Sequence, residues 1–542
     1  MGVKKLWQLV EASGKNVSPL DLHGNILGID FSCWICADKS VNLRMSQDVK
    51  LYLRNIFFRL NYLLQLGILP YAIFDGQAPD LKIETMKSRE GQLSRPNSKP
   101  CTQSSTKRSN FSRVNKEMDL LLSLIGVPSI VSPGEAEKLC AILNRTGIVD
   151  ACVSNDGDCF LYGAEKVLRN FSISVKNQHI FLFRREEITR LLGAGRYHFI
   201  ILGLLCGCDY FPEGVPKIGQ SIAFSLIESI KSEPDVQRIL EILKGKLDRS
   251  EEAYFIRKHK AWSRVFDHLA PFKDRVDKII QEFMDDGDLL KRIKLPKREK
   301  IFWSRPDCVK IVNFFQEKMD WPPIYTLAHI LPLVALWDLR RLIQIKNPQG
   351  YAHLASIPLP PASGLTMINE EITDEIRLTP KRIIKECRVN FIDYYLIEFE
   401  KMPCDVWTTP NEIEHYNIRL RKNEFSLVHN GLIAEYEEGI RSKKEMKKPK
   451  KVKEAMKKEN KFDDLLTDFA KINLSNENFD PIKVPIVVEE RPKPNPFSRL
   501  FIEKLAFRRR SLDTSIVSSC DEFAIPTKTP LRERLLKSGY KM

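Results

Sequence analysis

The 542-residue chain has no apolar run long enough to cross a bilayer. Its longest run, Phe199 to Cys206, falls far short of the roughly 20 residues that a spanning helix needs. No signal peptide is found, so the 12 cysteines are expected to be reduced intracellular thiols rather than a disulfide framework. Myristoylation is not expected either, because Leu6 stands where a Ser or Thr is needed after Met1-Gly2. These absences argue against a membrane or secreted protein.

The length predicts three or four domains at about 150 residues each, and the composition, 43% hydrophobic and 29% charged, is that of a globular protein. A net charge of +15 suggests a polyanionic partner. Residues Arg441 to Lys461 carry 11 basic and 3 acidic side chains, so this segment alone contributes +8. A solvated basic tail could account for much of the charge, and nucleic-acid binding has to be argued from individual sites.

The N-terminal part of the chain has the pattern of one α/β domain. Residues 1–90 alternate strand-like and helix-like patterns, with apolar runs at Ile26–Ile29 and Leu69–Phe74 that suit strands. Residues 91–113 are basic and polar, which predicts an exposed loop or a disordered insert. Strand and helix patterns resume over residues 114–209, so the domain spans the insert.

The remaining residues divide into a helical part, a β-rich part and a tail. Residues 210–350 have helical periodicity, with breaks at prolines, and predict an all-α extension. Residues 380–440 predict a small β-rich module, because Tyr395–Phe399 alternates like a strand and His429–Glu438 can close the module as a helix. Residues 441–542 predict a mostly disordered basic tail.

Acidic residues follow the predicted strands and open a predicted helix. Three groups come just after apolar, strand-like runs, and ligand sites in parallel sheets form at the carboxyl ends of strands. Another pair follows Ser132-Pro133-Gly134, a helix-start signal, and the last follows an apolar helix. The seven residues are Asp30, Asp75, Glu135, Glu137, Asp156, Asp158 and Asp209. Their joint placement predicts one acidic crevice.

Seven carboxylates packed together would repel one another, and burial would raise some of their pKa values, unless cations neutralise them. Two Mg²⁺ ions supply four positive charges, and hard divalent ions prefer oxygen ligands. Two metals about 3.5 to 4 Å apart can activate a water and stabilise the leaving oxygen of a phosphodiester, so we predict phosphodiester hydrolysis. Each acid taken alone has an ordinary structural alternative, and Asp156-Gly157 is also a hairpin-turn sequence.

Six motifs, in order, resemble those of the flap endonuclease superfamily of structure-specific nucleases. They are Met1-Gly2-Val3-Lys4-Lys5-Leu6-Trp7, Gly28-Ile29-Asp30, Phe74-Asp75-Gly76, Pro133-Gly134-Glu135-Ala136-Glu137, Asn155-Asp156-Gly157-Asp158 and Gly207-Cys208-Asp209-Tyr210. The resemblance covers about residues 1–350. It implies a PIN-like nuclease core whose seven acids bind two Mg²⁺ ions, with Mn²⁺ as a substitute.

The resemblance also implies DNA contacts. Lys82 and Arg89 match the Lys and Arg that contact the scissile phosphate in that family, and their spacing of seven places both cations on one helix face. The sequence from Gly214 to Gly219 resembles the hairpin of a helix-hairpin-helix module, where backbone amides approach a phosphate and a K⁺ ion. Taken alone, it is also an ordinary turn. The DNA-contacting set that we assign is Gly2, Arg59, Gly214, Val215, Lys217 and Gly219.

Three features favour the GEN-type Holliday-junction resolvase branch of that family. The insert after Arg89 is short and polar, so a long helical arch looks absent. Cys36 stands where flap endonucleases similar to this chain carry a base-stacking Tyr. Residues Arg388–Glu438 resemble a chromodomain, which that branch carries after its nuclease core. No PCNA-binding sequence of the flap endonuclease kind is found, and a flap endonuclease without junction resolution stays the alternative.

Two other functions fit parts of the sequence. Cys33-Trp34-Ile35-Cys36 has the cysteine spacing of thioredoxin-like redox enzymes. Together with Cys206 and Cys208, its two cysteines could also supply the four ligands of a zinc site. Both cysteine pairs lie in apolar helices, however, where packing of Cys as a small hydrophobic residue explains them. A methyl-lysine cage in the chromodomain-like segment would suit a non-enzymatic chromatin protein. Its aromatic residues, which we expect to form the core instead, are Tyr394, Tyr395, Phe399 and Trp407.

The tail carries two sequences typical of nuclear transport, although each is also common in disordered tails. A nuclear localisation sequence is formed by Lys447, Lys448, Lys450 and Lys451, and the spacing of a nuclear export signal is found at Leu466, Phe469, Ile472 and Leu474. We therefore expect a nuclear protein that shuttles with the cytoplasm. The sequence has one set of seven acids and no long heptad repeat of a coiled coil, so we expect a monomer in solution that pairs on four-way junctions. We expect it to cut 5′ flaps and forks as well, and to have no membrane partner.

Overall fold

The computed structural model describes residues 2–3, 6–42, 50–83, 85, 103–171, 180–230, 232–246, 249–354, 357–361, 378–389, 391–400 and 416–443. The chain divides into two units, Met1–Lys450 and Lys451–Met542, and all of these residues lie in the first. Arg89, Trp407 and both predicted transport sequences lie outside the described residues, as do residues 91–102 of the predicted insert.

The described elements follow the chain in this order. The strands are β1 Lys15–Val17, β2 Ile26–Asp30, β3 Leu69–Phe74, β4 Ser129–Val131, β5 Ala151–Val153, β6 Lys166–Arg169, β7 Ile180–Arg184, β8 Pro380–Val389, β9 Ile392–Phe399 and β10 Tyr416–Arg421. The helices are α1 Leu6–Val10, α2 Phe31–Asn42, α3 Leu51–Leu66, α5 Gln103–Ile125, α6 Ala136–Arg145, α7 Asp158–Leu161, α8 Arg185–Leu192, α9 Arg196–Cys206, α10 Gln220–Ser229, α11 Glu233–Leu243, α12 Arg249–Lys258, α13 Ser263–Leu269, α14 Lys273–Met284, α15 Gly287–Arg292, α16 Cys308–Met319, α17 Pro323–Lys346, α18 Pro348–His353 and α20 Lys422–Phe425. Short 3₁₀ helices are η1 Glu11–Ser13, η2 Pro19–Leu22, η3 Lys260–Trp262, η4 Ala270–Phe272 and η5 Arg298–Lys300, and residues 430–443 are also helical.

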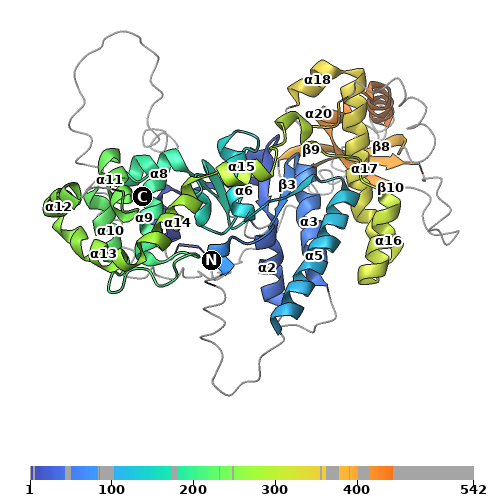
Figure 1. Ribbon diagram of the computed structural model, residues 1–542. Coiled ribbons are helices and arrows are strands. Elements are labelled where there is room, and N and C mark those ends of the chain that lie inside the picture. Colours follow the sequence, from blue (N-terminus) through green and yellow to red (C-terminus); the bar gives the residue numbers. More distant parts are fainter. Residues whose placement is uncertain are drawn as a thin grey trace, which may run out of the picture. The chain divides into compact units, whose positions relative to one another are not determined.

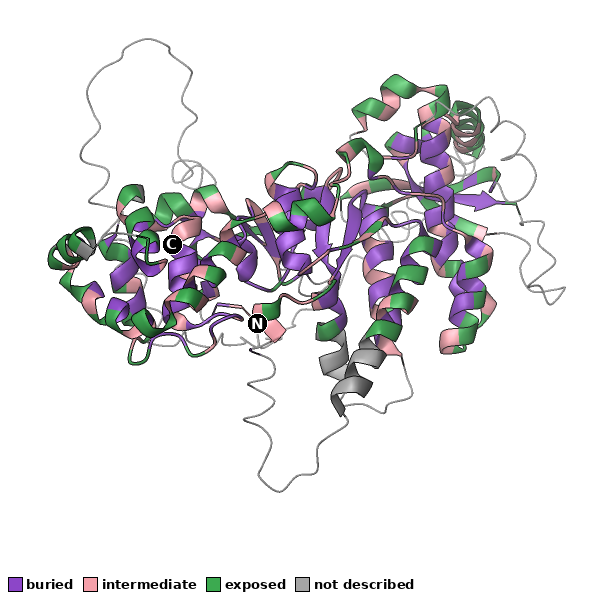
Figure 2. Ribbon diagram, in the orientation of Figure 1, coloured by how far each residue is buried: buried purple, intermediate pink, exposed green. Residues whose placement is uncertain are grey.

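Seven strands form one sheet in the order β1-β7-β6-β5-β2-β3-β4. Figure 1 shows β3 of this sheet beside α3 and α6. The strands from β6 to β4 pair in parallel, while β7 and β1 add antiparallel strands at one edge. Every residue of β2 and β3 is buried, as expected for strands covered on both faces (Figure 2). The predicted mostly parallel α/β core is confirmed, and its neighbouring strands β2, β3 and β5 end at the same edge.

The predicted polar insert is wrong at its C-terminal end. Helix α5 begins at Gln103, not after Arg113, and runs for 23 residues. Residues 103–113, which the composition predicts as part of the insert, contain no Gly or Pro. Farther along the helix, the side chains of Met118, Leu121 and Ile125 are buried and anchor it in the core. Polar composition there reflects a helix rather than a loop, because tertiary packing supplies most of the stability of a helix.

The predicted all-α extension is borne out by helices α10 to α18. One expectation fails inside it, since α17 continues through Pro332 instead of breaking there. A proline costs a helix one hydrogen bond, but Ile330, Leu331, Leu333 and Val334 on both sides of this one are buried and hold the helix in place.

The apolar helix α9 is a core helix. Its residues from His198 to Leu205 are all buried. No single helix in the described ranges is long and apolar enough to cross a membrane, and only the bent pair of α8 and α9 has a suitable length and composition when joined.

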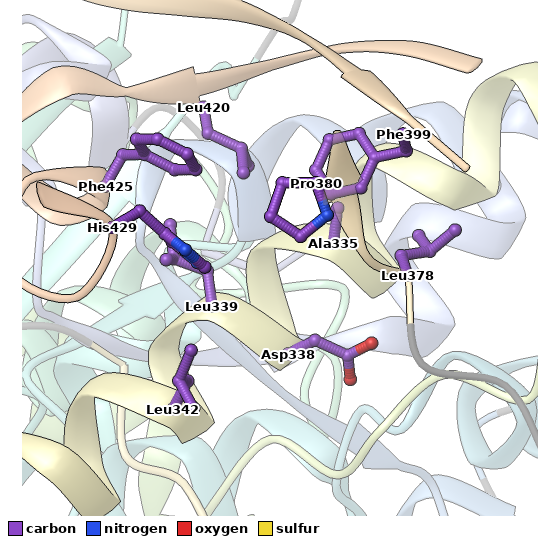
Figure 3. A pocket seen from close by; sticks show the side chains of 10 residues that line it. All are labelled: Ala335, Asp338, Leu339, Leu342, Leu378, Pro380, Phe399, Leu420, Phe425 and His429. Atoms are coloured by element: carbon purple, nitrogen blue, oxygen red, sulfur yellow. The ribbon is translucent and has the colours of Figure 1, made fainter. Parts of the chain in front are cut away.

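Strands β8, β9 and β10, α20 and helix 430–443 form what we call the C-terminal module. Its antiparallel sheet has the order β10-β9-β8, and Tyr395, Ile397 and Phe399 are buried as their alternation predicts. A cavity of only about 30 Å³ separates the module from α17, and Phe399 and Phe425 line it beside aliphatic side chains (Figure 3). Both rings are almost fully buried, as expected for side chains of the module's core.

Buried charges also hold the C-terminal module to α17. The guanidinium of Arg340 donates to both carboxylate oxygens of Glu424, at 2.8 and 3.0 Å, and both side chains are almost fully buried. Arg421 of β10 donates to the carbonyl oxygen of Leu66, at the end of α3, over 3.0 Å. Ion pairs of this kind fix one docking geometry, because a buried charge without its partner is costly.

Candidate active site

Strand ends place four of the seven carboxylates. Asp30 is the last residue of β2, Asp75 directly follows β3, and Asp156 follows β5 by three residues. Asp158 opens α7, so Asp156-Gly157 leads into a helix and is not a hairpin turn. Because β2, β3 and β5 are parallel neighbours, these side chains meet at one edge of the sheet.

Helix ends place the other three. Glu135 is the N-cap residue of α6 and Glu137 lies in its first turn, where the helix dipole favours negative charge. Asp75 Oδ1 accepts the amide of Ala136 at 2.7 Å, which ties the end of β3 to the start of α6. Asp209 follows the end of α9 by three residues. All seven predicted acids therefore gather in one region.

Asp30 is held firmly at the centre of the sheet edge. Its Oδ1 accepts the amide of Cys33 at 2.9 Å, and its Oδ2 accepts the hydroxyl of Ser154 at 3.1 Å. Burial and the charges of Asp75 and Asp156 together raise the pKa of Asp30 to about 7. This carboxyl group is therefore fixed in place, and its ionised form is destabilised by the neighbouring negative charges.

The pKa values of three more acids are raised by burial first and by the surrounding carboxylates second. Those of Glu137 and Asp158 lie well above their usual range, and that of Asp156 is raised as well. Carboxylates that raise one another's pKa values in this way are typical of a site that binds cations.

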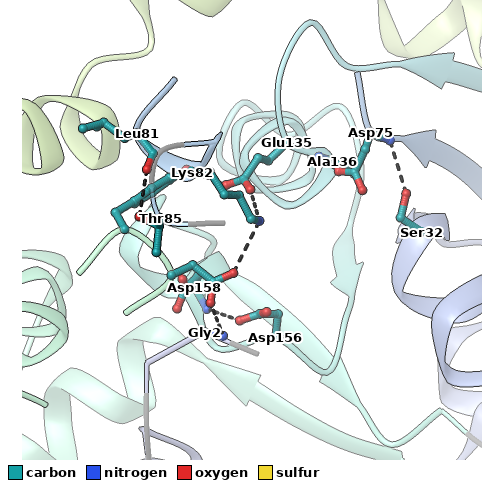
Figure 4. Close-up of polar contacts among 12 residues, drawn as sticks. Gly2, Ser32, Asp75, Leu81, Lys82, Thr85, Glu135, Ala136, Asp156 and Asp158 are labelled. Atoms are coloured by element: carbon teal, nitrogen blue, oxygen red, sulfur yellow. Dashed lines mark hydrogen bonds and ion pairs between the residues drawn. The ribbon is translucent and has the colours of Figure 1, made fainter. Parts of the chain in front are cut away.

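Lys82 is the basic residue that reaches this cluster. Its ammonium group forms an ion pair with Oε1 of Glu135 (Figure 4). The same group lies 3.4 Å from Oδ2 of Asp209. Burial alone would lower the pKa of Lys82, but the charges of Glu135 and Glu137 outweigh it, and the pKa is raised. Lys82 therefore stays positively charged at the mouth of the site.

The N-terminal residues close the site from another side. The amide of Val3 donates to Oδ1 of Asp158 at 2.7 Å, and the amide of Gly2 lies 3.4 Å from Oδ1 of Asp209. Gly2 has a φ of +78°, and a Cβ there would lie 1.9 Å from Oδ1 of Asp156 (Figure 4). Gly2, which we assigned to DNA contact, thus has a packing role against the acids that its sequence position did not reveal.

The donor chemistry fits hard divalent cations. All seven side chains offer oxygen ligands, and Oε2 of Glu137 is buried without a hydrogen-bond partner in the described part of the chain. In that part, no three acidic, histidine or cysteine side chains already converge in a geometry that could hold a metal ion. The acids supply charge and ligand type, while Lys82 partly neutralises them.

The raised pKa of Asp30 predicts how the stability of the protein without metal ions depends on pH. An acid whose pKa is higher in the folded state causes no penalty below its unfolded pKa, near 3.8. The destabilisation of the folded state grows as pH rises above that value and is complete once pH passes the folded pKa, here about 7. We expect Asp30→Asn to raise the melting temperature of chelator-treated protein more at pH 8 than at pH 6. Each kcal/mol corresponds to roughly 2–4 °C. Thermal melts of both proteins check this, and a difference that does not change with pH contradicts it.

The residues of the predicted helix-hairpin-helix turn differ in exposure. Gly214 has a φ of +63° and packs against the carbonyl oxygen of Leu205. Lys217 has the same φ and is exposed. Gly219, the N-cap residue of α10, is exposed as well. Val215 is buried, and its amide donates to the carbonyl of Leu205 at 2.9 Å. The side chain and the amide of Val215 are thus both engaged within the fold, and its assignment to DNA contact stays a prediction.

The assignment of Arg59 to DNA contact stays a prediction. The guanidinium of Arg59 on α3 lies 5.3 Å from the ring of Trp34, a cation–π distance. Cys33 is unsuited to redox chemistry, because burial and the charge of Asp30 raise the pKa of its thiol to about 11.

Sequence reasoning missed two tyrosines of this site. Tyr162 and Tyr210 both donate to Oε2 of Glu135 from the buried side. Tyr210 follows Asp209 directly, which is the one signal that could have pointed to it. Tyr162 belongs to none of the motifs, and only the fold brings it to Glu135.

Two regions match known family models. Residues 1–95 match the XPG N-terminal domain, and residues 126–209 match the XPG I-region. All seven acids and Lys82 lie inside these two regions. The family that the six motifs indicate is thereby supported by the whole sequence of both regions.

Individual proteins give the same result. The human protein "Flap endonuclease GEN homolog 1" is 30% identical over 393 residues, covering 62% of this chain and 42% of that protein. "Single-strand DNA endonuclease 1" of Oryza sativa subsp. japonica is 30% identical over 387 residues, covering 66% of this chain and 58% of that protein. The chain thus spans about half the length of these relatives.

The fold also matches a solved structure. The crystal structure of human GEN1 in complex with Holliday junction DNA superposes with a TM-score of 0.62 at 29% identity, covering 82% of this chain and 100% of that chain. The resemblance to the flap endonuclease superfamily and its GEN-type members is confirmed.

Proposed function

We propose that this chain, a member of the XPG-like flap endonuclease superfamily, is a divalent-metal-dependent endonuclease that hydrolyses phosphodiesters in branched DNA. The observation that carries the proposal is the gathering of seven carboxylates, four with raised pKa values, at one edge of a parallel sheet. Two Mg²⁺ ions, with Mn²⁺ as a substitute, would provide the nucleophilic water and neutralise the leaving oxygen when bound there. The carboxylates would hold these ions and exclude other anions from the site.

Lys82 would orient the scissile phosphate. Its ammonium group lies at the mouth of the acidic cluster, in contact with Glu135 and Asp209, where a phosphate oxygen can replace a carboxylate as its partner. Arg89, seven residues farther along the sequence, would join it from about two turns away on the same helix face. The two cations would then fix one phosphate for in-line attack.

Lys82→Ala should lower the rate of cleavage by about 10²-fold or more, in the range of other electrostatic transition-state contacts. DNA affinity should fall much less, because many other phosphate contacts remain. Single-turnover cleavage and equilibrium binding on one junction separate the two effects. Lys310→Ala, which removes an exposed ion pair with Asp307 on α16, is the control. An affinity loss as large as the rate loss would make Lys82 an ordinary backbone contact.

Four-way junctions are the substrate that we favour, since GEN-type proteins are among the relatives and the human GEN1 structure was solved with Holliday junction DNA. The C-terminal module would extend the DNA-binding surface as a chromodomain-like element. Its buried Tyr395 and Phe399 support packing rather than the aromatic cage of a chromatin reader. A K⁺ ion at the Gly214–Gly219 turn, nuclear localisation through the tail, and roles in DNA repair and recombination belong to the same proposal.

Junction resolution requires two nicks, and one acidic site per chain can cut one strand at a time, so two chains would act on each junction. We expect a monomer in solution, two chains per junction, and a second nick faster than the first on a supercoiled cruciform plasmid. Sedimentation and nick timing measure these quantities, and cut positions on a junction, a 5′ flap, a fork and plain duplex complete the test. One chain per junction with uncoupled nicks would favour the alternative, a flap endonuclease without junction resolution.

A further inference from the structure

Two buried tyrosines meet the carboxylate of Glu135 from inside the protein. The hydroxyl of Tyr162 lies 3.0 Å from Oε2 and that of Tyr210 lies 2.5 Å from the same oxygen. The two hydroxyls are 2.6 Å apart, so the three oxygens form a closed triangle. Both side chains are at most 1% exposed. A tyrosine hydroxyl is a hydrogen-bond donor near neutral pH, because a phenol ionises only at about pH 10, so the carboxylate oxygen is the acceptor.

The two oxygens of Glu135 consequently differ. Oε2 faces inward and is occupied by the tyrosine hydroxyls, whereas Oε1 faces the cluster and contacts Lys82. A carboxylate held in this way can offer only one oxygen to a cation. We propose that Tyr162 and Tyr210 are positioning residues that hold Oε2 of Glu135, so that Oε1 alone is presented to a divalent metal ion. This inference rests on the proposed metal-dependent nuclease function.

The tyrosines are themselves fixed by neighbouring elements. The ring of Phe283 on α14 lies 5.1 Å from that of Tyr162 and 5.3 Å from that of Tyr210. Arg275, also on α14, donates to the backbone carbonyl of Tyr210 at 3.0 Å, and the ammonium of Lys138 lies 5.8 Å from the ring of Tyr162. The helical extension thereby braces the groups that orient Glu135. Such preorganisation lets hydrogen bonds around a metal ligand influence binding of the metal.

Tyr162→Phe and Tyr210→Phe test the proposal, because each removes one hydroxyl and keeps the ring that Phe283 packs against. Removal of a hydrogen bond to a metal ligand typically costs 10- to 100-fold in metal affinity or activity. We expect Mn²⁺ binding, measured by calorimetry without DNA, to weaken by about this factor in each variant. The Mg²⁺ concentration for half-maximal cleavage should rise in parallel, with the rate at saturating Mg²⁺ much closer to wild type. The double variant should lose less than the product of the two factors, since the hydroxyls share one partner.

Tyr52→Phe is a matched control. It removes a tyrosine–glutamate hydrogen bond of 2.7 Å, from Tyr52 to Glu117, that involves none of the seven carboxylates. This variant should bind Mn²⁺ as the wild type does, and melting temperatures of all variants show that they fold. Wild-type Mn²⁺ affinity in both Tyr162→Phe and Tyr210→Phe, or an equal loss in Tyr52→Phe, overturns the positioning role.

The result also separates this inference from the function on which it rests. Wild-type protein that binds Mn²⁺ with the expected dependence on Tyr162 and Tyr210, but cuts no branched DNA, would overturn the nuclease proposal and support the positioning role. Wild-type protein that binds no Mn²⁺ would overturn the metal assignment and the positioning role together.

Discussion

We expect Asp30→Asn to lower the rate of cleavage of branched DNA by at least about 10³-fold, while binding of the same DNA persists. Asp30 lies at the centre of the acidic cluster, next to Asp75 and Asp156, and loss of one charged ligand removes several kcal/mol of metal-dependent stabilisation from the transition state. DNA affinity comes mainly from phosphate contacts made by basic residues, which the substitution leaves in place. Single-turnover cleavage at saturating enzyme and a binding titration in Ca²⁺ measure the two quantities.

The variant should remain folded, because Asn is nearly isosteric with Asp. Its carbonyl oxygen can still accept the amide of Cys33, and the hydroxyl of Ser154 can turn to accept the new amide group. Asp150→Asn is the control at the opposite edge of the sheet. Asp150 directly precedes β5, accepts the amide of Ile26 at the start of β2 and pairs with Arg298. That change should affect stability and leave the rate unaltered. Cleavage by Asp30→Asn at near the wild-type rate would contradict the metal assignment.

The acidic site could be predicted from sequence because its geometry follows a local rule. Asp30, Asp75 and Asp156 come at or just after the ends of strands that are apolar throughout, and parallel pairing alone makes such ends coincide. The helix-start signal Ser132-Pro133-Gly134 likewise predicts that Glu135 lies at the start of a helix, where the structure places it. These placements need only the order of the elements and the sense of their pairing.

The contacts inside the site could not be predicted in the same way. Lys82 and Glu135 are 53 residues apart, Tyr162 and Tyr210 are 48 apart, and Gly2 and Asp209 are 207 apart. No spacing rule connects positions at such separations, and only the packed fold decides which of many buried polar side chains meet. The start of α5 was missed for a related reason, since packing of its second half overrides the polar composition of its first half.

The second large effect is expected at Gly2. A Cβ at this position would lie 1.9 Å from Oδ1 of Asp156 and 2.6 Å from Oδ1 of Asp158, distances that no real contact allows. Gly2→Ala must therefore displace either the N-terminal residues or both carboxylates, and would break the bond from the amide of Val3 to Asp158. Because a misplacement of about 1 Å in a catalytic site can cost 10²-fold, we expect cleavage to fall by at least that factor.

Gly147→Ala distinguishes this clash from backbone strain. Gly147 has a φ of +74°, nearly the same as the +78° of Gly2, but no atom lies within 4 Å of the position that its Cβ would take. Both variants pay the cost of a left-handed alanine, roughly 1–2 kcal/mol, and only Gly2→Ala also collides with the acids. Rates measured at saturating Mg²⁺ should therefore fall for Gly2→Ala and stay at wild type for Gly147→Ala. Equal loss in both would assign the effect to stability, and no loss in Gly2→Ala would mean that the N-terminal residues do not close the site.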